Sequence, residues 1–274
     1  MPELPEVETV VNVLKPQIID LTVSRITINK PQVIAYPAVE EFCTRLTGQK
    51  ISGMKRRGKF IIICFASGYQ LILHLRMTGC LLVTPAEDNI ADHTHVIFEL
   101  ENNTQLRFID TRRFGRFWMI KKGEEDNVSG INKLGIEPFD AVLTADYLQS
   151  ILSNRKKTIK ECLLDQSLIA GIGNIYSDEI LFRANIDPMR KANTLNSCEL
   201  ERLAAEIPRT LEYYMEKNEI TPEEYLKKQG RGYNNSSFLN VYGQDNKLCP
   251  VCGEILHRRV IGGRSSVYCQ NCQK

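Results

Sequence analysis

The chain has 274 residues, of which 43% are apolar, and a formal net charge of +2. This length predicts about two domains with real hydrophobic cores. No apolar run approaches the roughly 20 residues needed to span a bilayer, and the acidic N-terminus excludes the basic-then-apolar pattern of a signal peptide. We therefore expect a cytosolic protein with no membrane partner. Its nine cysteines are then expected to be thiols or metal ligands and not disulfides.

The first eight residues, Met-Pro-Glu-Leu-Pro-Glu-Val-Glu, combine three carboxylates with two prolines. A frayed chain end is the ordinary alternative, but it predicts no particular composition. If Met1 is removed, Pro2 becomes a terminal secondary amine with a pKa of roughly 8, partly neutral at physiological pH. Such an amine can attack an aldehyde-like carbon and form a Schiff base, and Glu3 beside it can act as acid or base.

The N-terminal half is expected to be mostly strands. Val7, Val10, Val11 and Leu14 recur at helical spacing, which predicts a helix entered through Pro5. A second helix is predicted over 39–46. Short segments rich in β-branched and aromatic residues then predict strands, and their spacing favours a β-sandwich or barrel over about 1–125. The predicted strands are 59–65, 69–76, 95–100, 105–109 and 116–120.

A charged, Gly-rich stretch within 121–137 predicts a linker, after which the pattern turns helical. Thr144, Thr158 and Thr221 are candidate N-caps. A further helix is expected after Gly173, and another over 197–217, kinked by Pro208. Residues 229–240 are polar and Gly-containing, which predicts a mobile loop.

The C-terminal cysteines have the spacing C-x2-C-x16-C-x2-C, through Cys249, Cys252, Cys269 and Cys272. This spacing is typical of a tetrahedral structural zinc site, in which four thiolates leave no open position for catalysis. About 28 residues cannot bury enough core alone, so zinc would supply the folding energy. Two strands, 255–261 and 266–268, are predicted about a turn at 262–263. Four unligated cysteines are the disfavoured alternative.

Basic residues gather in islands at 55–59, 107–122 and 155–160, which suits a face presented to a polyanion, although each island alone fits a solvated surface. The segment Gly171-Ile-Gly-Asn174 opens a helix whose free N–H groups would favour an anion, and Lys160 in the preceding helix would add a phosphate partner; a plain helix turn is the alternative. Met77 and Phe114 lie beside arginines in turns, so they are candidate wedges for a base stack or else core residues. Lys59 is a surface charge or a phosphate contact.

These motifs occur in one order, and together the chain resembles the formamidopyrimidine-DNA glycosylases over essentially its whole length. The resemblance rests on the N-terminal Pro-Glu-Leu-Pro-Glu-Val-Glu, Arg-Arg-Gly-Lys at 56–59, His-Leu-x-Met-x-Gly at 74–79, Asp-x-Arg-Arg-Phe-Gly at 110–115, Gly-Ile-Gly-Asn-Ile-Tyr at 171–176, Val-Tyr-Gly at 241–243 and the zinc hairpin.

The resemblance implies an α+β multidomain protein. It implies a β-sandwich catalytic domain at 1–125, a linker at 126–137, a helix–two-turn–helix DNA-binding domain at 138–240 with a lesion loop at about 218–240, and a zinc-finger β-hairpin at 241–274. The DNA is expected in the cleft between domains. The implied partner is double-stranded DNA with oxidised bases or abasic sites, bound by a monomer in the bacterial cytoplasm in association with the nucleoid.

The family's residue roles carry over by position. Pro2 is the implied nucleophile, Glu3 the acid/base partner, and Lys59 a phosphate contact near the reacting sugar. Met77, Arg112 and Phe114 would fill the gap left by the extruded base, with Arg112 on the orphaned cytosine. Asn174 and Arg264 would hold the flanking phosphates, with support from Lys160 and Tyr176. The only implied cofactor is one structural zinc ion.

The implied activity is base-excision repair by a bifunctional glycosylase and AP lyase that removes oxidised purines through β,δ-elimination. Two alternatives stay open: an endonuclease VIII-like enzyme for oxidised pyrimidines, and a non-catalytic zinc-ribbon DNA-binding protein. The Met77, Arg112 and Phe114 set and Leu4 argue against the first. The chain departs from the family at 234–238, Asn-Asn-Ser-Ser-Phe, where Phe-Gln usually follows Gly-Tyr. Preference among 8-oxoguanine, formamidopyrimidines and other lesions therefore stays open.

Overall fold

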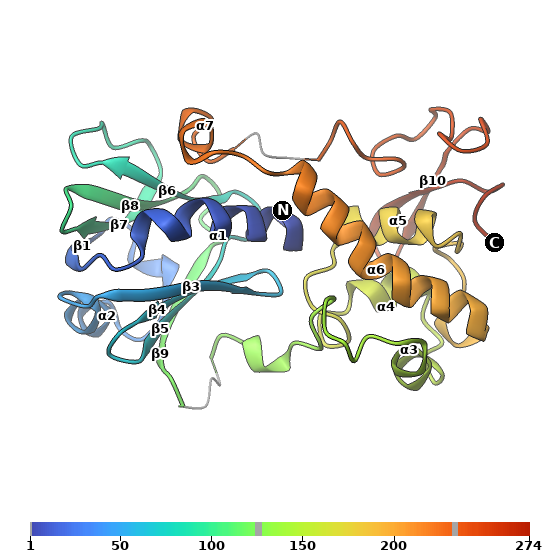
Figure 1. The fold of residues 1–274 in the computed structure, drawn as a ribbon, viewed down its shortest axis with the longest axis horizontal. Helices are drawn as coiled ribbons and strands as arrows, with labels where there is room; N and C mark the ends of the chain where they lie inside the picture. The colour runs from blue at the N-terminus through green and yellow to red at the C-terminus, as the bar shows by residue number, and fades with distance from the viewer. Residues whose placement is uncertain (1, 124–127, 232–234) are drawn as a thin grey trace. The chain divides into compact units, whose positions relative to one another are not determined.

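The structure is a computed structural model that describes residues 2–123, 128–231 and 235–274. The chain divides into two compact units (Figure 1). Unit 1 comprises residues 1–2, 6–132 and 218–234, and unit 2 comprises residues 3–5, 133–217 and 235–274. Within the described ranges, no helix is both long and apolar enough to cross a membrane.

Unit 1 is built on two β-sheets (Figure 1). The four-stranded sheet has the order β1-β7-β8-β6 and is antiparallel throughout. The five-stranded sheet has the order β2-β9-β5-β4-β3, with one parallel pair, β2 and β9. The strands are β1 (Val23–Ile28), β2 (Ile34–Tyr36), β3 (Ile51–Arg57), β4 (Phe60–Phe65), β5 (Tyr69–His74), β6 (Gly79–Pro85), β7 (Thr94–Leu100), β8 (Thr104–Asp110) and β9 (Arg116–Lys121).

The two sheets share one hydrophobic core, which makes the expected sandwich. Phe108 of β8 and Phe117 of β9 meet edge to face with ring centroids 5.0 Å apart, so each sheet contributes an aromatic residue to the same contact. Helix α1 (Leu4–Ile18) and helix α2 (Val39–Leu46) add apolar side chains to this core. The predicted helices at both places are confirmed.

A short helix, α7 (Pro222–Lys227), also belongs to unit 1 although it follows unit 2 in sequence. Thr221 caps it by accepting a hydrogen bond from Glu224 N, as the sequence predicts. Tyr225 is buried in the sandwich core, and its hydroxyl donates to the carbonyl of Leu81 at 3.0 Å. This bond fixes one end of the predicted lesion loop.

Unit 2 is helical, with a second core of its own. The predicted caps Thr144 and Thr158 accept hydrogen bonds from the first turns of α3 and α4, and Thr158 forms a reciprocal capping box with Glu161. Helix α6 continues through Pro208, so the expected kink stays a prediction. The helices of unit 2 are α3 (Ala145–Leu152), α4 (Ile159–Leu164), α5 (Asn174–Arg183) and α6 (Ser197–Lys217), and a single 3₁₀ turn lies at Ala192–Thr194. Two further 3₁₀ turns lie outside it, Pro31–Val33 in unit 1 and Ile131–Lys133 at the boundary of the two units.

The C-terminal hairpin consists of β10 (His257–Ile261) and β11 (Arg264–Tyr268), joined at Gly262-Gly263 as predicted. Its third small core forms around Phe182 of α5. Two backbone hydrogen bonds fix the last residue. Lys274 N donates to the carbonyl of Asn185, and Asp187 N donates to the carbonyl of Lys274. Within unit 2, the hairpin is therefore packed against α5 along β11 and against residues 185–187 at the chain end.

Four strands were not predicted: β1, β2, β3 and β6. β3 carries three basic residues, so its sequence indicates an exposed island instead of a strand, and β2 has only three residues. β6 begins at a glycine and is buried along most of its length, so no alternation marks it. Of the predicted linker at 126–137, residues 126–127 lie outside the described part, as do residues 232–234 of the predicted loop.

Candidate functional site

Four candidate residues of unit 1 lie at one end of the five-stranded sheet. Lys59 is in the turn between β3 and β4, Met77 follows β5, and Arg112 and Phe114 precede β9. The strand register pairs Phe60 with His74 and His74 with Arg116, which brings the three connections to the same edge. The sequence alone could not place them together, because β9 neighbours β5 in the sheet but lies far from it in sequence.

Met77 and Phe114 are exposed, at 44% and 49% of their surface, so the alternative that both are core residues is wrong. The Arg112 guanidinium lies 4.9 Å from the Phe114 ring centroid, a cation–π contact that joins two of the predicted gap-filling residues. Lys59 is buried, so a freely solvated surface charge is also excluded for it.

Asp110 holds the turn that carries Arg112 and Phe114, and the sequence analysis missed this role. Its side chain is 0% exposed. Oδ1 accepts from the Thr78 hydroxyl and from Arg112 N, and Oδ2 accepts from Gly115 N at 2.8 Å. An Asp at the first position of a turn is a recognisable signal, because its carboxylate accepts backbone N–H groups two residues on.

His74 is a buried neutral histidine at the same sheet end. Burial, with smaller effects from Arg76 and Lys59, lowers the pKa of His74 to about 3. Its Nδ1 accepts a hydrogen bond from Arg76 N at 3.0 Å, so the proton of the neutral ring is on Nε2. The ring packs edge to face on Phe60 at 4.8 Å.

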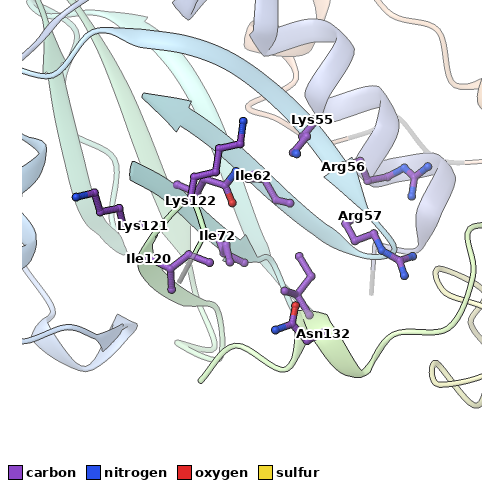
Figure 2. A pocket seen from close by; sticks show the side chains of 12 residues that line it. Lys55, Arg56, Arg57, Ile62, Ile72, Ile120, Lys121, Lys122 and Asn132 are labelled. Atoms are coloured by element: carbon purple, nitrogen blue, oxygen red, sulfur yellow. The ribbon is translucent and has the colours of Figure 1, made fainter. Parts of the chain in front are cut away.

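Two of the predicted basic islands meet in a groove of about 330 Å³ on the five-stranded sheet (Figure 2). Its floor is apolar and its rim is basic. Arg56 is already engaged, since Nε donates to Glu8 at 2.6 Å. Three acidic residues at 124–126 follow directly in sequence, outside the described part, so the groove is assigned no ligand. The residues labelled in Figure 2 are Lys55, Arg56, Arg57, Ile62, Ile72, Ile120, Lys121, Lys122 and Asn132.

In unit 2, the carboxylate of Glu3 occupies the N-terminus of α5. Oε2 accepts from Gly173 N at 2.9 Å and from Tyr176 N at 3.2 Å, and Oε1 accepts from Ile175 N at 3.0 Å. Glu3 is 2% exposed. The N–H groups that the sequence analysis offered to an external anion therefore bind the protein's own carboxylate, so that interpretation is wrong.

Both glycines of the Gly-Ile-Gly-Asn segment are needed for this contact. A Cβ on Gly173 would overlap the Glu3 carboxylate, and one on Gly171 would overlap the Leu4 side chain. Gly171 also has φ +91°, which favours glycine. Leu4 N donates to the carbonyl of Gly171 at 3.1 Å. The segment 3–4 is thereby fixed, and Pro2, which is half-buried, is the residue directly before it.

Lys160, Asn174 and Arg264 also meet at this end of α5. Lys160 Nζ and Asn174 Nδ2 each donate to the carbonyl of Ser265 at 3.0 Å, next to the exposed Arg264. Lys160 is itself 0% exposed and forms an ion pair with Asp178 at 2.6 Å. In this arrangement Lys160 cannot touch a phosphate, so a direct DNA contact by Lys160 is corrected to support of the hairpin.

Burial sets the electrostatics of the Lys160–Asp178 pair. Burial lowers the pKa of Lys160 and raises that of Asp178 to about 6, although the charge of each partner shifts the other's pKa in the opposite direction. Asp178 also accepts from Ser266 Oγ at 2.6 Å and from Val267 N at 3.0 Å. These contacts attach β11 to α5.

Tyr176 is fully buried, so its side chain supports the site from within. Its hydroxyl accepts from Asn235 Nδ2 at 2.7 Å, and the same amide group donates to the carbonyl of Tyr214 at 3.1 Å. At the far end, Asn240 N donates to Glu179 at 3.0 Å. Residues 235–240 are the C-terminal part of the predicted mobile loop. They are held by hydrogen bonds at both residue 235 and residue 240.

The four C-terminal cysteines form the predicted metal site. Their Sγ atoms all lie within 4.8 Å of one another, with Cys249–Cys272 at 3.8 Å and Cys252–Cys269 at 3.5 Å. Four thiolates about 2.3 Å from a tetrahedral zinc ion would be about 3.8 Å apart. The donor set and its spacing fit one structural zinc ion.

Three family models match the chain: "Formamidopyrimidine-DNA glycosylase N-terminal domain" over 1–117, "Formamidopyrimidine-DNA glycosylase H2TH domain" over 134–224, and "Zinc finger found in FPG and IleRS" over 246–274. The third model supports the zinc assignment.

Similar proteins extend along the whole chain. A formamidopyrimidine-DNA glycosylase of Pelotomaculum thermopropionicum is 43% identical over 100% of this chain and 99% of its own, and one of Moorella thermoacetica is 44% identical over 94% of both. The Lactococcus lactis Fpg (MutM) solved in complex with oxidised-pyrimidine DNA is 29% identical, covers both chains fully, and has a TM-score of 0.88. The same protein with Fapy-dG DNA gives 0.88 as well, over 99% of this chain and 100% of its own.

Full-length identity above 40% and the ordered match of all three models agree with the sandwich, the helix–two-turn–helix arrangement and the cysteine hairpin. The chain belongs to the formamidopyrimidine-DNA glycosylase family.

Proposed function

We propose that this protein removes oxidised purines from double-stranded DNA and then cleaves the resulting abasic site, using the amine of Pro2 as nucleophile. The observation that carries the proposal is the fixed position of Glu3, whose carboxylate accepts three backbone N–H groups at the start of α5. A carboxylate fixed by three backbone N–H groups has a defined position directly after a candidate terminal amine, as an acid–base partner of that amine requires. Met1 lies outside the described residues, so its removal is part of the proposal.

The reaction balances without further reagents. The Pro2 nitrogen forms a bond to C1′ while the glycosidic bond breaks, and the base leaves with a proton. Glu3 first takes a proton from the protonated Pro2 amine and then gives it to the ring oxygen as the sugar opens to the iminium. The iminium acidifies the 2′ proton, so the C3′–O3′ bond breaks by β-elimination. Loss of the 4′ proton then breaks the C5′–O5′ bond, and water releases Pro2.

The exposed residues at the sheet end suit the handling of the duplex. Extrusion of a nucleotide costs a few kcal/mol of stacking, which apolar insertion and phosphate contacts can offset. Met77 and Phe114 are the exposed apolar side chains there, and Arg112 is the cation stacked on Phe114. We assign these three to the gap in the duplex, with Arg112 on the orphaned cytosine, and Lys59 to the phosphate at the lesion.

The end of α5 and the zinc hairpin suit phosphate binding. Arg264 is exposed at the hairpin tip, and Asn174 is tied to the neighbouring carbonyl. We assign both to the phosphates that flank the lesion. Zinc, when bound, supplies the folding energy of the hairpin and no chemical step.

Borohydride trapping tests the proposal. Protein with a confirmed free Pro2 should become covalently linked to DNA that contains 8-oxoguanine or an abasic site, and an acetylated terminus should abolish the adduct. Pro2→Gly should lower base release by about 10² or more while lesion binding stays close to the wild type. If protein with a free Pro2 gives no adduct on any oxidised or abasic DNA, the hypothesis of a non-catalytic zinc-ribbon DNA-binding protein replaces the proposed glycosylase.

A substrate panel separates oxidised purines from oxidised pyrimidines. A solved relative is a complex with DNA that contains an oxidised pyrimidine, which makes this second class worth measuring. The expected order is formamidopyrimidines and 8-oxoguanine opposite cytosine above any oxidised pyrimidine. The reverse order would favour the endonuclease VIII-like alternative.

A further inference from the structure

Met77 and Phe114, two exposed apolar residues of unit 1, come from different connections, and one carboxylate links both. Met77 lies between β5 and β6, and Phe114 lies between β8 and β9. Asp110 Oδ1 accepts from the hydroxyl of Thr78, which directly follows Met77. The same carboxylate accepts from Arg112 N at 3.2 Å and from Gly115 N at 2.8 Å, on both sides of Phe114.

A further hydrogen bond joins Thr78 directly to the turn that carries Arg112. Arg112 N lies 3.2 Å from Thr78 Oγ1 as well as from Asp110 Oδ1, so one N–H is shared between the two side chains. Thr78 therefore bonds to the turn that carries Arg112 directly and through the carboxylate. The strand pairing brings the two together, because Gly79 of β6 pairs with Asp110 of β8.

The backbone around Asp110 is itself held. His95 Nε2 donates to the Asp110 carbonyl at 2.7 Å, and Asp110 N donates to the carbonyl of His93 at 3.1 Å. Arg113 has φ 60°, so the chain reverses directly after Arg112. A Cβ on Gly115 would overlap the Phe108 ring, so the other side of the turn rests on the sandwich core. The carboxylate thus sits on a rigid base.

We propose that Asp110 and Thr78 are a positioning pair that sets Met77, Arg112 and Phe114 as one unit for insertion into the duplex. This inference rests on the proposed function and adds to it two residues that touch neither the reacting sugar nor the base. Their effect is expected only on substrates with a base stack to fill, because the hydrogen bonds of Thr78 and Asp110 run to the turn at 112–115 and to neighbouring strands of unit 1.

The test compares borohydride trapping on duplex abasic DNA, with cytosine opposite, and on the same abasic strand alone. The single strand has no orphaned base and no opposing stack, so insertion contributes nothing there. Thr78→Val and Asp110→Asn should slow trapping on the duplex by about ten-fold, the size expected for the loss of a hydrogen bond to a charged group. Trapping on the single strand should match the wild type.

Two controls separate positioning from general damage. Thr78→Ser keeps the hydroxyl and should restore the duplex rate. Thr84→Val makes the same exchange on β6 at a buried threonine whose hydroxyl has no hydrogen-bond partner among the described residues, and it should change neither rate. The double variant Thr78→Val/Asp110→Asn should be no slower than the slower single variant, because both remove one link.

The outcomes are distinct. Equal slowing on duplex and single strand, or a Thr78→Ser variant as slow as Thr78→Val, would overturn the positioning role. If Asp110→Asn does not fold, the comparison of Thr78→Val with Thr78→Ser still tests the positioning role. If the wild-type protein formed an adduct with neither substrate, the result would count against the proposed function itself. There would then be no trapping rate for Thr78 and Asp110 to change.

Discussion

At the scale of single residues, the most informative contact joins Glu3 to backbone 170 positions away. An α-helix offers unpaired N–H groups at its start, and a carboxylate there gains both hydrogen bonds and a favourable dipole. The sequence analysis identified Glu3 as an acid or base and Gly171 and Gly173 as a close-approach segment. It could not pair them, because periodicity and spacing describe neighbours in sequence only.

Gly173→Ala should displace the Glu3 carboxylate, because the added Cβ would overlap it. Base release should fall by about 10² or more, the range for a lost acid–base group, while DNA affinity changes little. Single-turnover excision and a binding titration measure the two quantities. Gly53→Ala is the matched control, since its Cβ would meet only Cys64 Cβ at an ordinary 3.7 Å. Unchanged excision by Gly173→Ala would show that the contact is dispensable.

His74 should make the folded protein sensitive to acid. Its pKa falls from 6.5 to about 3 on burial, so the unfolded chain binds this proton more tightly. The stabilising effect is complete above pH 6.5 and is lost as the pH falls towards 3, at up to about 1.4 kcal/mol per pH unit. His74→Gln should flatten the dependence of the unfolding free energy over this range. His257→Gln, at an exposed histidine, is the control and should leave the slope unchanged.

At the scale of elements, the sequence predicts most of the framework. Caps at Thr144, Thr158 and Thr221 are confirmed because capping depends on residues three positions apart. Strands with an aromatic or β-branched run were found, whereas β3 and β6 were missed, one for its charge and one for its uninterrupted burial. Sequence patterns therefore predict elements that are stabilised by residues close in sequence. They do not predict strands whose stability depends on their partners in the sheet.

The same limit applies to the candidate site. Lys160 was identified from its charge and assigned to phosphate, but its partner Asp178 lies on another helix. A buried lysine with a buried acid is a support for neighbouring elements, here α4, α5 and β11. Charge in a sequence does not distinguish the two cases, since burial depends on the whole fold.

Asp178→Leu should destabilise unit 2 by about 3–5 kcal/mol, because it leaves the Lys160 charge buried without its partner. The double variant Lys160→Met/Asp178→Leu should recover much of this loss, since no charge is then buried. Calorimetric scans of the three proteins measure it. The pair of the exposed Arg209 with the half-buried Glu206 supplies the control, and Arg209→Gln should shift the free energy of unfolding by about 1 kcal/mol or less. A double variant as unstable as the single one would contradict the argument.

At the scale of the whole molecule, stability comes from different sources in different parts. The sandwich and the helices each have an extended core, but the hairpin has only a small cluster around Phe182 and the cysteines. A segment of that size depends on its metal. The cysteine spacing and the short length of the segment predict this dependence from the sequence.

Removal of zinc by a chelator should unfold the hairpin and weaken lesion-DNA binding, while the sandwich keeps its β-sheet signal. Circular dichroism and a DNA titration follow the two effects, and metal analysis should give one zinc per chain. Cys272→Ser should lose the metal. Cys198→Ser, at an exposed cysteine outside the cluster, should retain it. A holo-protein with less than one zinc per chain would contradict the ligand set.

The Glu3 contact has a practical consequence for recombinant work. Because residues 3 and 4 are held by hydrogen bonds to 171–176, we expect the fold to form whatever precedes Pro2. Under the proposed mechanism, a cleavage scar of even one amino acid converts the secondary amine into an amide that cannot attack a sugar. We expect such a preparation to be folded but inactive, which would invalidate an activity assay but would suit crystallisation with an intact lesion. Mass spectrometry of the N-terminus should therefore accompany every preparation.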